Sequence, residues 1–232
     1  GLNFNDLLSG KIDFNKLKEK NLQIDNHIPP EFLSAAGSFV DSFKGMADFI
    51  EARQNKNSRK LFLDELGLSE NAIRNPRLLV NANALVVAGN ILSELGLDEN
   101  DMNEMSLLFS MKNEKRKQIR AYMHDCETDY DIGKKSCGLA NNHYEKNFQY
   151  SIETKGEAFI ITGVSNEEIH DVLKMDKIIG ELLTHFKAYT VANTALFVFN
   201  KPMRLIDVQN YMSKGRQYHK FIYKEQRTKQ LQ

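Results

Sequence analysis

Apolar residues between the Pro29-Pro30 pair and residue 54 recur at intervals of three and four positions, which predicts a long helix from Glu31. Six of them fall on one stripe of that helix: Phe32, Ala36, Phe39, Phe43, Met46 and Ile50. The stripe either packs on the chain's own core or forms the seam of a homodimer. It covers fewer than three heptads, and a coiled-coil assignment needs about 3–4, so both alternatives stay open.

Glycine stops and polar N-caps predict a series of shorter helices up to residue 124. They cover residues 59–66, 70–75, 81–95, the segment from Asp98 past Phe109, and 112–124. Gly67 and Gly96 stand where a left-handed residue ends a helix, and Ser69 caps the helix that Pro76 stops. The same succession of helix, glycine and capped helix occurs at 63–73 and 92–102. We interpret it as repeated capping chemistry, because a solenoid needs at least about three repeats.

The periodicity changes to two in the last third of the chain. Residues 125–146 are polar and predict an irregular connection, and 147–163 predict a β-hairpin. Ser165 and Glu168 form a capping box for a helix that runs to about Tyr189. A third strand over 195–199, a short helix over 205–214 and a fourth strand over 217–223 complete the predicted order.

These elements predict an α+β fold. Its N-terminal two-thirds is helical, and its C-terminal third has the order β-β-α-β-α-β, a small, mostly antiparallel sheet packed by one long helix. We expect an N-terminal arm over 1–30, and a tail or linker over 226–232. Between them lies a single α+β sensing domain over 31–225, with a helical part (31–124) and a sheet part (147–225).

The composition excludes several classes of protein. Hydrophobic residues make up 41% of the 232 residues, enough for a core, and 31 basic residues balance 31 acidic ones. The net basic field of most nucleic-acid binders is therefore absent. Two cysteines give no disulfide framework and fit a reducing, cytoplasmic location. No apolar run is long enough to predict a membrane span. The chain begins with Gly rather than Met, so we expect an output domain attached in a longer parent protein.

One group of residues has the chemistry of a metal or redox site. His124, Cys126, Cys137 and His143 lie within twenty residues of each other, and two thiolates with two imidazoles can complete a tetrahedral zinc site. The spacing H-x-C-x10-C-x5-H differs from zinc-finger spacing. The alternatives are a redox pair of Cys126 and Cys137, or a polar loop whose side chains have no common role.

Catalytic motifs are absent from the sequence, which contains no P-loop, no G-x-S-x-G and no H-E-x-x-H. We therefore expect no enzymatic activity, and no cofactor is required by the sequence. A basic run comprises Lys112, Lys115, Arg116, Lys117 and Arg120. It could contact phosphate, but a solvated helix face is favoured, because Glu114 dilutes the charge. Direct nucleic-acid binding is not expected.

Two stretches resemble the effector-sensing domains of AraC/XylS-type bacterial transcription regulators. The first comprises Leu66-Gly67-Leu68, Ile73, Asn75-Pro76 and Val80; the second runs from the apolar segment 196–202 through Tyr211 to Phe221. Asn200-Lys201-Pro202 stands where that family carries His-Pro. The resemblance covers roughly residues 45–225 as an order of elements.

The resemblance implies a regulatory sensory domain that binds a small molecule and signals to the attached output domain, in transcription regulation or signal transduction. It also implies a homodimer. The alternative is an adaptor or effector that acts as a protein–protein interaction module through the stripe in residues 31–54, without a small-molecule ligand. That alternative predicts no internal cavity.

Overall fold

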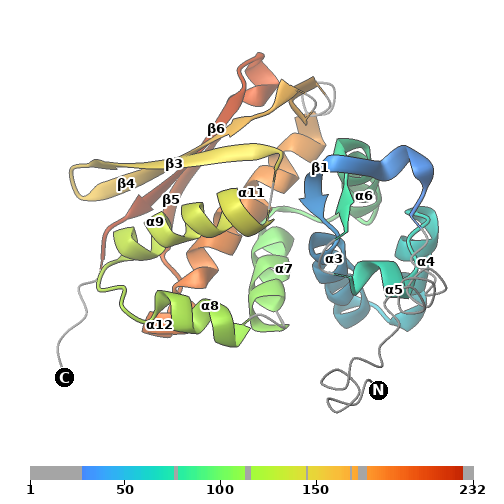
Figure 1. Ribbon diagram of the computed structural model, residues 1–232, viewed down its shortest axis with the longest axis horizontal. Helices are drawn as coiled ribbons and strands as arrows, with labels where there is room; N and C mark the ends of the chain where they lie inside the picture. Colours follow the sequence, from blue (N-terminus) through green and yellow to red (C-terminus); the bar gives the residue numbers. More distant parts are fainter. Residues whose placement is uncertain are drawn as a thin grey trace, which may run out of the picture.

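The computed structural model describes residues 28–75, 78–112, 116–144, 146–167, 169–171 and 177–226. The predicted arm over 1–30 and tail over 226–232 lie almost wholly outside these residues. Figure 1 shows a β-sheet with helices packed on one of its faces, next to a second group of helices built from the N-terminal part of the chain. The described helices include none that is long and apolar enough to span a membrane.

The N-terminal part contains mostly short helices. Its elements are η1 (Pro30–Phe32), β1 (Leu33–Phe39), α3 (Asp41–Arg53), α4 (Lys56–Glu65), α5 (Glu70–Ile73), β2 (Leu79–Val80), α6 (Ala82–Glu94), α7 (Glu99–Lys112) and α8 (Arg116–Met123). Gly67 and Gly96 follow α4 and α6 at φ 63° and 71°, and the Ser69 hydroxyl accepts from Ala72 N at 3.1 Å. The predicted helix stops and this cap are therefore confirmed.

The predicted helix from Glu31 is wrong over its first half, where the chain forms β1. Strand β1 pairs antiparallel with β2, with Ser38 opposite Val80. Gly37 explains the difference: its φ of 155° is not helical, and a Cβ there would lie 2.1 Å from the Val80 carbonyl oxygen. The helix begins only at Asp41.

Most of the apolar stripe lies inside the chain's own core. Phe32, Phe43, Met46 and Ile50 are at most 6% exposed, and the side chains of Ala36 and Phe39 lie outside the described set. Packing on the chain's own core therefore accounts for these four side chains. Homodimerisation through this segment stays a prediction.

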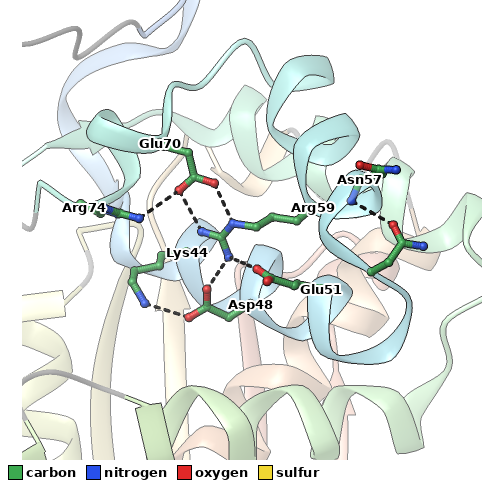
Figure 2. Close-up of polar contacts among 8 residues, drawn as sticks. Lys44, Asp48, Glu51, Asn57, Arg59, Glu70 and Arg74 are labelled. Carbon is green, nitrogen blue, oxygen red and sulfur yellow. Dashed lines mark hydrogen bonds and ion pairs between the residues drawn. The ribbon is translucent and has the colours of Figure 1, made fainter.

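Arg59 of α4 connects α3, α4 and α5 through ion pairs (Figure 2). Its Nε and Nη2 donate to the two carboxylate oxygens of Glu70 at 2.7 and 3.1 Å. Its Nη1 donates to Asp48 and lies 3.5 Å from a Glu51 oxygen, and Lys44 donates to the other Asp48 oxygen at 2.8 Å. Arg59 is only 9% exposed, so one guanidinium neutralises carboxylates from two neighbouring helices.

The C-terminal part is a four-stranded antiparallel sheet. Its strands are β3 (Phe148–Lys155), β4 (Ala158–Ser165), β5 (Arg204–Asn210) and β6 (Tyr218–Lys224), in the order β3-β4-β6-β5. The predicted hairpin is confirmed: Lys155 pairs with Ala158 around a turn with Gly156 at φ 62°. The α+β fold class is therefore confirmed.

The prediction for residues 125–146 is wrong, because α9 (Asp129–Leu139) and a π-helical turn (Ala140–Tyr144) replace the irregular connection. Thr128 and Asp131 form a capping box at the start of α9. Gly133 lets the helix approach the sheet closely, since a Cβ there would lie 2.9 Å from the Phe159 ring. A glycine that argues for a loop in the sequence is thus a packing residue in the structure.

Residues 195–214 also differ from the prediction. Leu196–Phe199 is a short helix (α12) rather than a strand, with Phe199 N donating to Ala195 O at 2.8 Å, and Asn200 ends it at φ 57°. Residues 204–210 form β5 rather than a helix. Short all-apolar runs do not distinguish helix from strand, and the alternation of β5 is interrupted by a break in its register with β6 between Leu205 and Asp207. Among the α-helices and strands described in this part of the chain, the order is β-β-α-α-β-β.

The long helix α11 covers Lys177–Thr194 and packs on the sheet side of α7 (Figure 1). The sequence predicts that Ser165 caps a helix that begins directly after it, and this assignment is wrong. Ser165 ends β4, and its hydroxyl donates to Gln217 O at 3.2 Å. Asn166 takes the capping role instead, because its Oδ1 accepts from Ile169 N at 2.9 Å.

Candidate functional site

A cavity of about 160 Å³ lies where the sheet, α11, α9 and the N-terminal helices meet. Most of its wall is apolar, and its apolar side chains include Met46, Leu85, Phe109, Phe186, Phe197 and Phe221. The volume is close to the roughly 150 Å³ of an engineered protein cavity that binds benzene. It is smaller than the sites of about 300–1,000 Å³ that hold drug-sized ligands. The cavity therefore suits a small, mainly apolar molecule.

Two threonines in the cavity wall have satisfied hydroxyl groups. Thr190 donates to Phe186 O at 2.8 Å, and Thr194 donates to Thr190 O at 3.0 Å, both within α11. Ser136 of α9 differs, because its hydroxyl oxygen is buried and has no hydrogen-bond partner within the described structure. An unsatisfied buried hydroxyl costs about 1–3 kcal/mol, so Ser136 is a position in the wall where the fold gives up stability.

Lys187 is the charged side chain among the described residues of the cavity wall. Its ammonium lies 3.5 Å from the Tyr150 hydroxyl, to which it donates, and 4.4 Å from the centre of the Phe148 ring. Tyr150 also belongs to the wall. The sheet end of the cavity therefore carries a positive charge next to a phenol.

His219 of β6 lies next to this charged end and is completely buried. Its ring stacks on Phe221, with centroids 4.6 Å apart, and packs against Phe148 at 4.7 Å. Gly163 opposite makes room for it, since a Cβ there would lie 2.3 Å from its Nε2. Burial, and then the nearby Lys187 charge, hold the pKa of His219 well below its usual range. His219 is therefore neutral at pH 7 and adds no charge to the site.

Three side chains of the sequence-predicted metal or redox site belong to the described structure, two of them buried and one exposed. Cys126 and Cys137 are buried and form no disulfide bond, and Cys137 belongs to the cavity wall. Burial raises the pKa of Cys137 to about 12, so it is a protonated thiol. His124 is largely exposed, and the His143 side chain lies outside the described set. Within the described ranges no three metal-ligating side chains gather, and the metal or redox role stays a prediction.

The residues that now define the site carried no signal in the sequence. Ser136, Tyr150 and Lys187 lie on α9, β3 and α11 and share no motif spacing. Only the fold brings them to one cavity. The available signal was indirect: Lys187 interrupts the apolar face of a long, otherwise core-forming helix.

No family model and no curated protein matches this sequence. Solved structures do match it. An H-NOX protein from S. oneidensis, solved in an Fe(II) ligation state, aligns at a TM-score of 0.56 with 10% identity over 84% of this chain and 99% of that chain. An Fe(II) unliganded H-NOX protein from K. algicida aligns at 0.55 with 12% identity over 84% and 100%. At these identities the comparison establishes structure alone: the chain has the α+β fold of the H-NOX proteins.

Proposed function

We propose that this chain is a regulatory sensory domain that binds a small, mainly apolar molecule in the cavity between the sheet and α11. The observation that carries the proposal is the cavity itself, with its apolar wall and few polar groups. The H-NOX neighbours, which are sensor domains, support the same general role. A protein-interaction module predicts no internal cavity, so the cavity favours the sensory domain.

The cavity does not fit the haem of the H-NOX neighbours. Its volume of about 160 Å³ lies below the range of sites that hold drug-sized ligands. A porphyrin is at least as large as such a ligand. Haem iron in proteins takes histidine, thiolate, methionine or tyrosine as axial ligand. The described wall contains side chains of three of these types, Met46, Tyr150 and Cys137, and no histidine, so it is the volume of the cavity that speaks against haem. We therefore propose sensing without haem, so that the fold is shared but the ligand is not.

The described C-terminal end of the chain contacts α9, the helix that supplies part of the cavity wall. The Glu225 carboxylate accepts from Asp129 N and Tyr130 N, both at 3.0 Å, at the N-terminus of α9. The same helix supplies Ser136 and Cys137 to the cavity. A ligand that shifts α9 therefore acts on the segment after β6, and we propose this contact as the route towards an attached output domain.

Benzene is a suitable first probe, because its size matches the cavity. We expect saturating benzene to raise the melting temperature of the protein; at 100 times Kd the added stability is about 2.7 kcal/mol. A Ser136→Phe variant fills the cavity, and benzene should no longer stabilise it. Far-UV circular dichroism checks that the variant is folded. If benzene has no effect on the melting of the unsubstituted protein, and native mass spectrometry finds no co-purified ligand, the sensory proposal is refuted.

A further inference from the structure

A second pocket lies on another face of α11, where that helix meets α7 and the strand β5 at the edge of the sheet. Its volume is about 380 Å³, within the range of about 300–1,000 Å³ that holds small ligands. Helix α11 contributes His185, Tyr189 and Ala192 to its wall, and these spacings of four and three place them on one face of the helix. No described residue belongs to both walls, so this α7–β5 pocket is separate from the cavity of the proposed sensory site.

A carboxylate, a phenol and an imidazole meet on the helical side of the α7–β5 pocket. The Tyr189 hydroxyl donates to Oε1 of Glu99 at 2.9 Å, and Nε2 of His185 lies 3.5 Å from the same oxygen. Burial, and then the contact with Glu99, raise the pKa of Tyr189 to about 12, so the phenol keeps its proton at pH 7. Tyr189 therefore holds the Glu99 carboxylate in the wall of the pocket.

The hydrogen bonding of His185 points to a positively charged donor. Its Nδ1 lies 3.0 Å from the carbonyl oxygen of Glu181, which can only accept, so Nδ1 carries a hydrogen. In the neutral ring Nε2 is then an acceptor, and it faces an oxygen of Glu99 that is also an acceptor. Two such acceptors are stabilised either by a proton on Nε2 or by an N–H group of a ligand that reaches both.

Strand β5 supplies a second carboxylate, Asp207, to the same pocket. The register of β5 with β6 breaks between Leu205 and Asp207, and such breaks re-aim side chains and are common next to active sites. The Asp207 carboxylate accepts from the neutral amide of Gln209 at 2.7 Å, and Ile206 beside it is 54% exposed. The described wall thus combines two carboxylates with apolar side chains and contains no Lys or Arg.

The two carboxylates are placed for two charged groups rather than for one ion. In the part of the chain that the structure describes, no three metal-ligating side chains gather, so Glu99, His185 and Asp207 do not converge on a single metal. Two carboxylates that share one pocket but not one ion are complementary to a ligand with two separate positive charges.

We propose that the α7–β5 pocket binds a small aliphatic diamine in its doubly protonated form, with one ammonium group on Glu99 and the other on Asp207. Each ammonium carries three donors, so the first also donates to Nε2 of His185, and the hydrocarbon chain lies on the apolar part of the wall. This site goes beyond the proposed sensory function and does not depend on it, because the two pockets have different walls.

An NMR titration of the isotope-labelled protein tests the proposal by comparing 1,4-diaminobutane and 1,6-diaminohexane with butylamine at pH 7 and constant ionic strength. The better diamine should bind about fivefold or more tightly than butylamine, because it adds one ion pair with a partly exposed carboxylate. The amide signals that shift should be those of residues 185–193 and 204–208, which contain the α11 and β5 parts of the wall.

Two variants with almost unchanged side-chain shape remove one charge each. Glu99→Gln and Asp207→Asn should each weaken diamine binding about fivefold, to the level of butylamine. Glu104→Gln is the matched control, because Glu104 is an exposed carboxylate of the same helix α7 that pairs with Arg53 at 2.8 Å and lies outside the described wall. This variant should keep the diamine preference, and circular dichroism melts check that all three variants are folded.

A diamine that binds no more tightly than butylamine overturns the proposal. A loss of affinity that is as large in Glu104→Gln as in Glu99→Gln also overturns it, because the attraction would then come from the general surface charge. Benzene binding is measured separately in the cavity between the sheet and α11, so a failure of the diamine proposal is distinguishable from a failure of the sensory function.

Discussion

Arg59 offers the clearest test of how the N-terminal helices are held together. Replacing Arg59 with Met keeps most of the aliphatic stem and removes the guanidinium. Asp48, whose side chain is 15% exposed, loses a largely desolvated charged hydrogen bond. Such a bond contributes about 1.5–3 kcal/mol. Because Lys44 still pairs with Asp48, we expect a loss in the lower half of that range. Glu70, at 47% exposure, loses a surface pair that contributes about 0.2–1 kcal/mol.

The sum predicts a loss of about 2–3 kcal/mol in the free energy of unfolding at pH 7. For a domain of 150–250 residues each kcal/mol lowers the melting temperature by about 2–4 °C, so we expect a fall of about 4–12 °C. Urea unfolding followed by circular dichroism measures the free energy directly. Arg74→Met is the matched control: its guanidinium is 66% exposed and 3.8 Å from Glu70, and the expected change is below about 0.5 kcal/mol.

The same variant predicts a pH dependence. Burial alone would raise the pKa of Asp48, but hydrogen bonds from Lys44 and Arg59 outweigh it and lower that pKa overall. The hydrogen bond from Arg59 lowers the pKa of Glu70. Carboxylates with lowered pKa values stabilise the fold above their unfolded pKa of about 4 and lose this contribution as the pH falls further. The difference in the free energy of unfolding between the unsubstituted protein and Arg59→Met should therefore shrink below about pH 4. A difference that is under about 0.5 kcal/mol at pH 7, or that is constant down to pH 3, would refute the reasoning.

Three further predictions follow from individual contacts. Gly163→Ala brings a Cβ against His219 and should lower the free energy of unfolding in urea by about 1–3 kcal/mol. Gly138→Ala is the control, because its new Cβ would meet only the Tyr122 hydroxyl, at 3.7 Å, and stability should stay unchanged or rise by up to about 1 kcal/mol. Equal effects of the two substitutions would contradict the packing around Gly163. Glu225→Gln weakens the acceptor at the N-terminus of α9, so amide exchange in the first turn of α9 should accelerate while exchange in β3 stays unchanged. Haem added to the purified protein should give no Soret band of an axially ligated iron, and a stoichiometric band would show that the cavity expands to hold it.

The helices of the N-terminal part were predictable because their ends are encoded locally. Ser69 and Gly67 act through their own backbone neighbourhood, and the structure confirms the cap and the stop that they predict. Segment 33–39 was not predictable, because its strand depends on a partner forty residues away and on the close approach that Gly37 allows. A helical period in a short apolar segment does not exclude a strand when a partner strand is present.

The sheet was predictable where alternation reflects burial on one face. Strand β6 alternates buried and half-buried positions over its whole length, and it was predicted correctly. Strand β5 lies at the edge, where Ile206 stands at a break in the register and is 54% exposed. Its burial pattern therefore does not have the period of two from which strands are recognised.

The site was hardest to predict for the same reason that α9 was missed. Residues 129–139 are polar and contain two glycines, which locally favour a loop. In the structure Gly133 allows close packing on the sheet, and Ser136 leaves a buried hydroxyl unsatisfied at the cavity. Local rules of sequence tend to fail at functional positions, where stability is given up for binding. The helix that violates these rules is also the one that contacts Glu225 at the end of the described chain. One helix therefore supplies part of the cavity wall and also contacts Glu225. Under the proposed function, α9 is the element through which occupancy of the cavity would be transmitted.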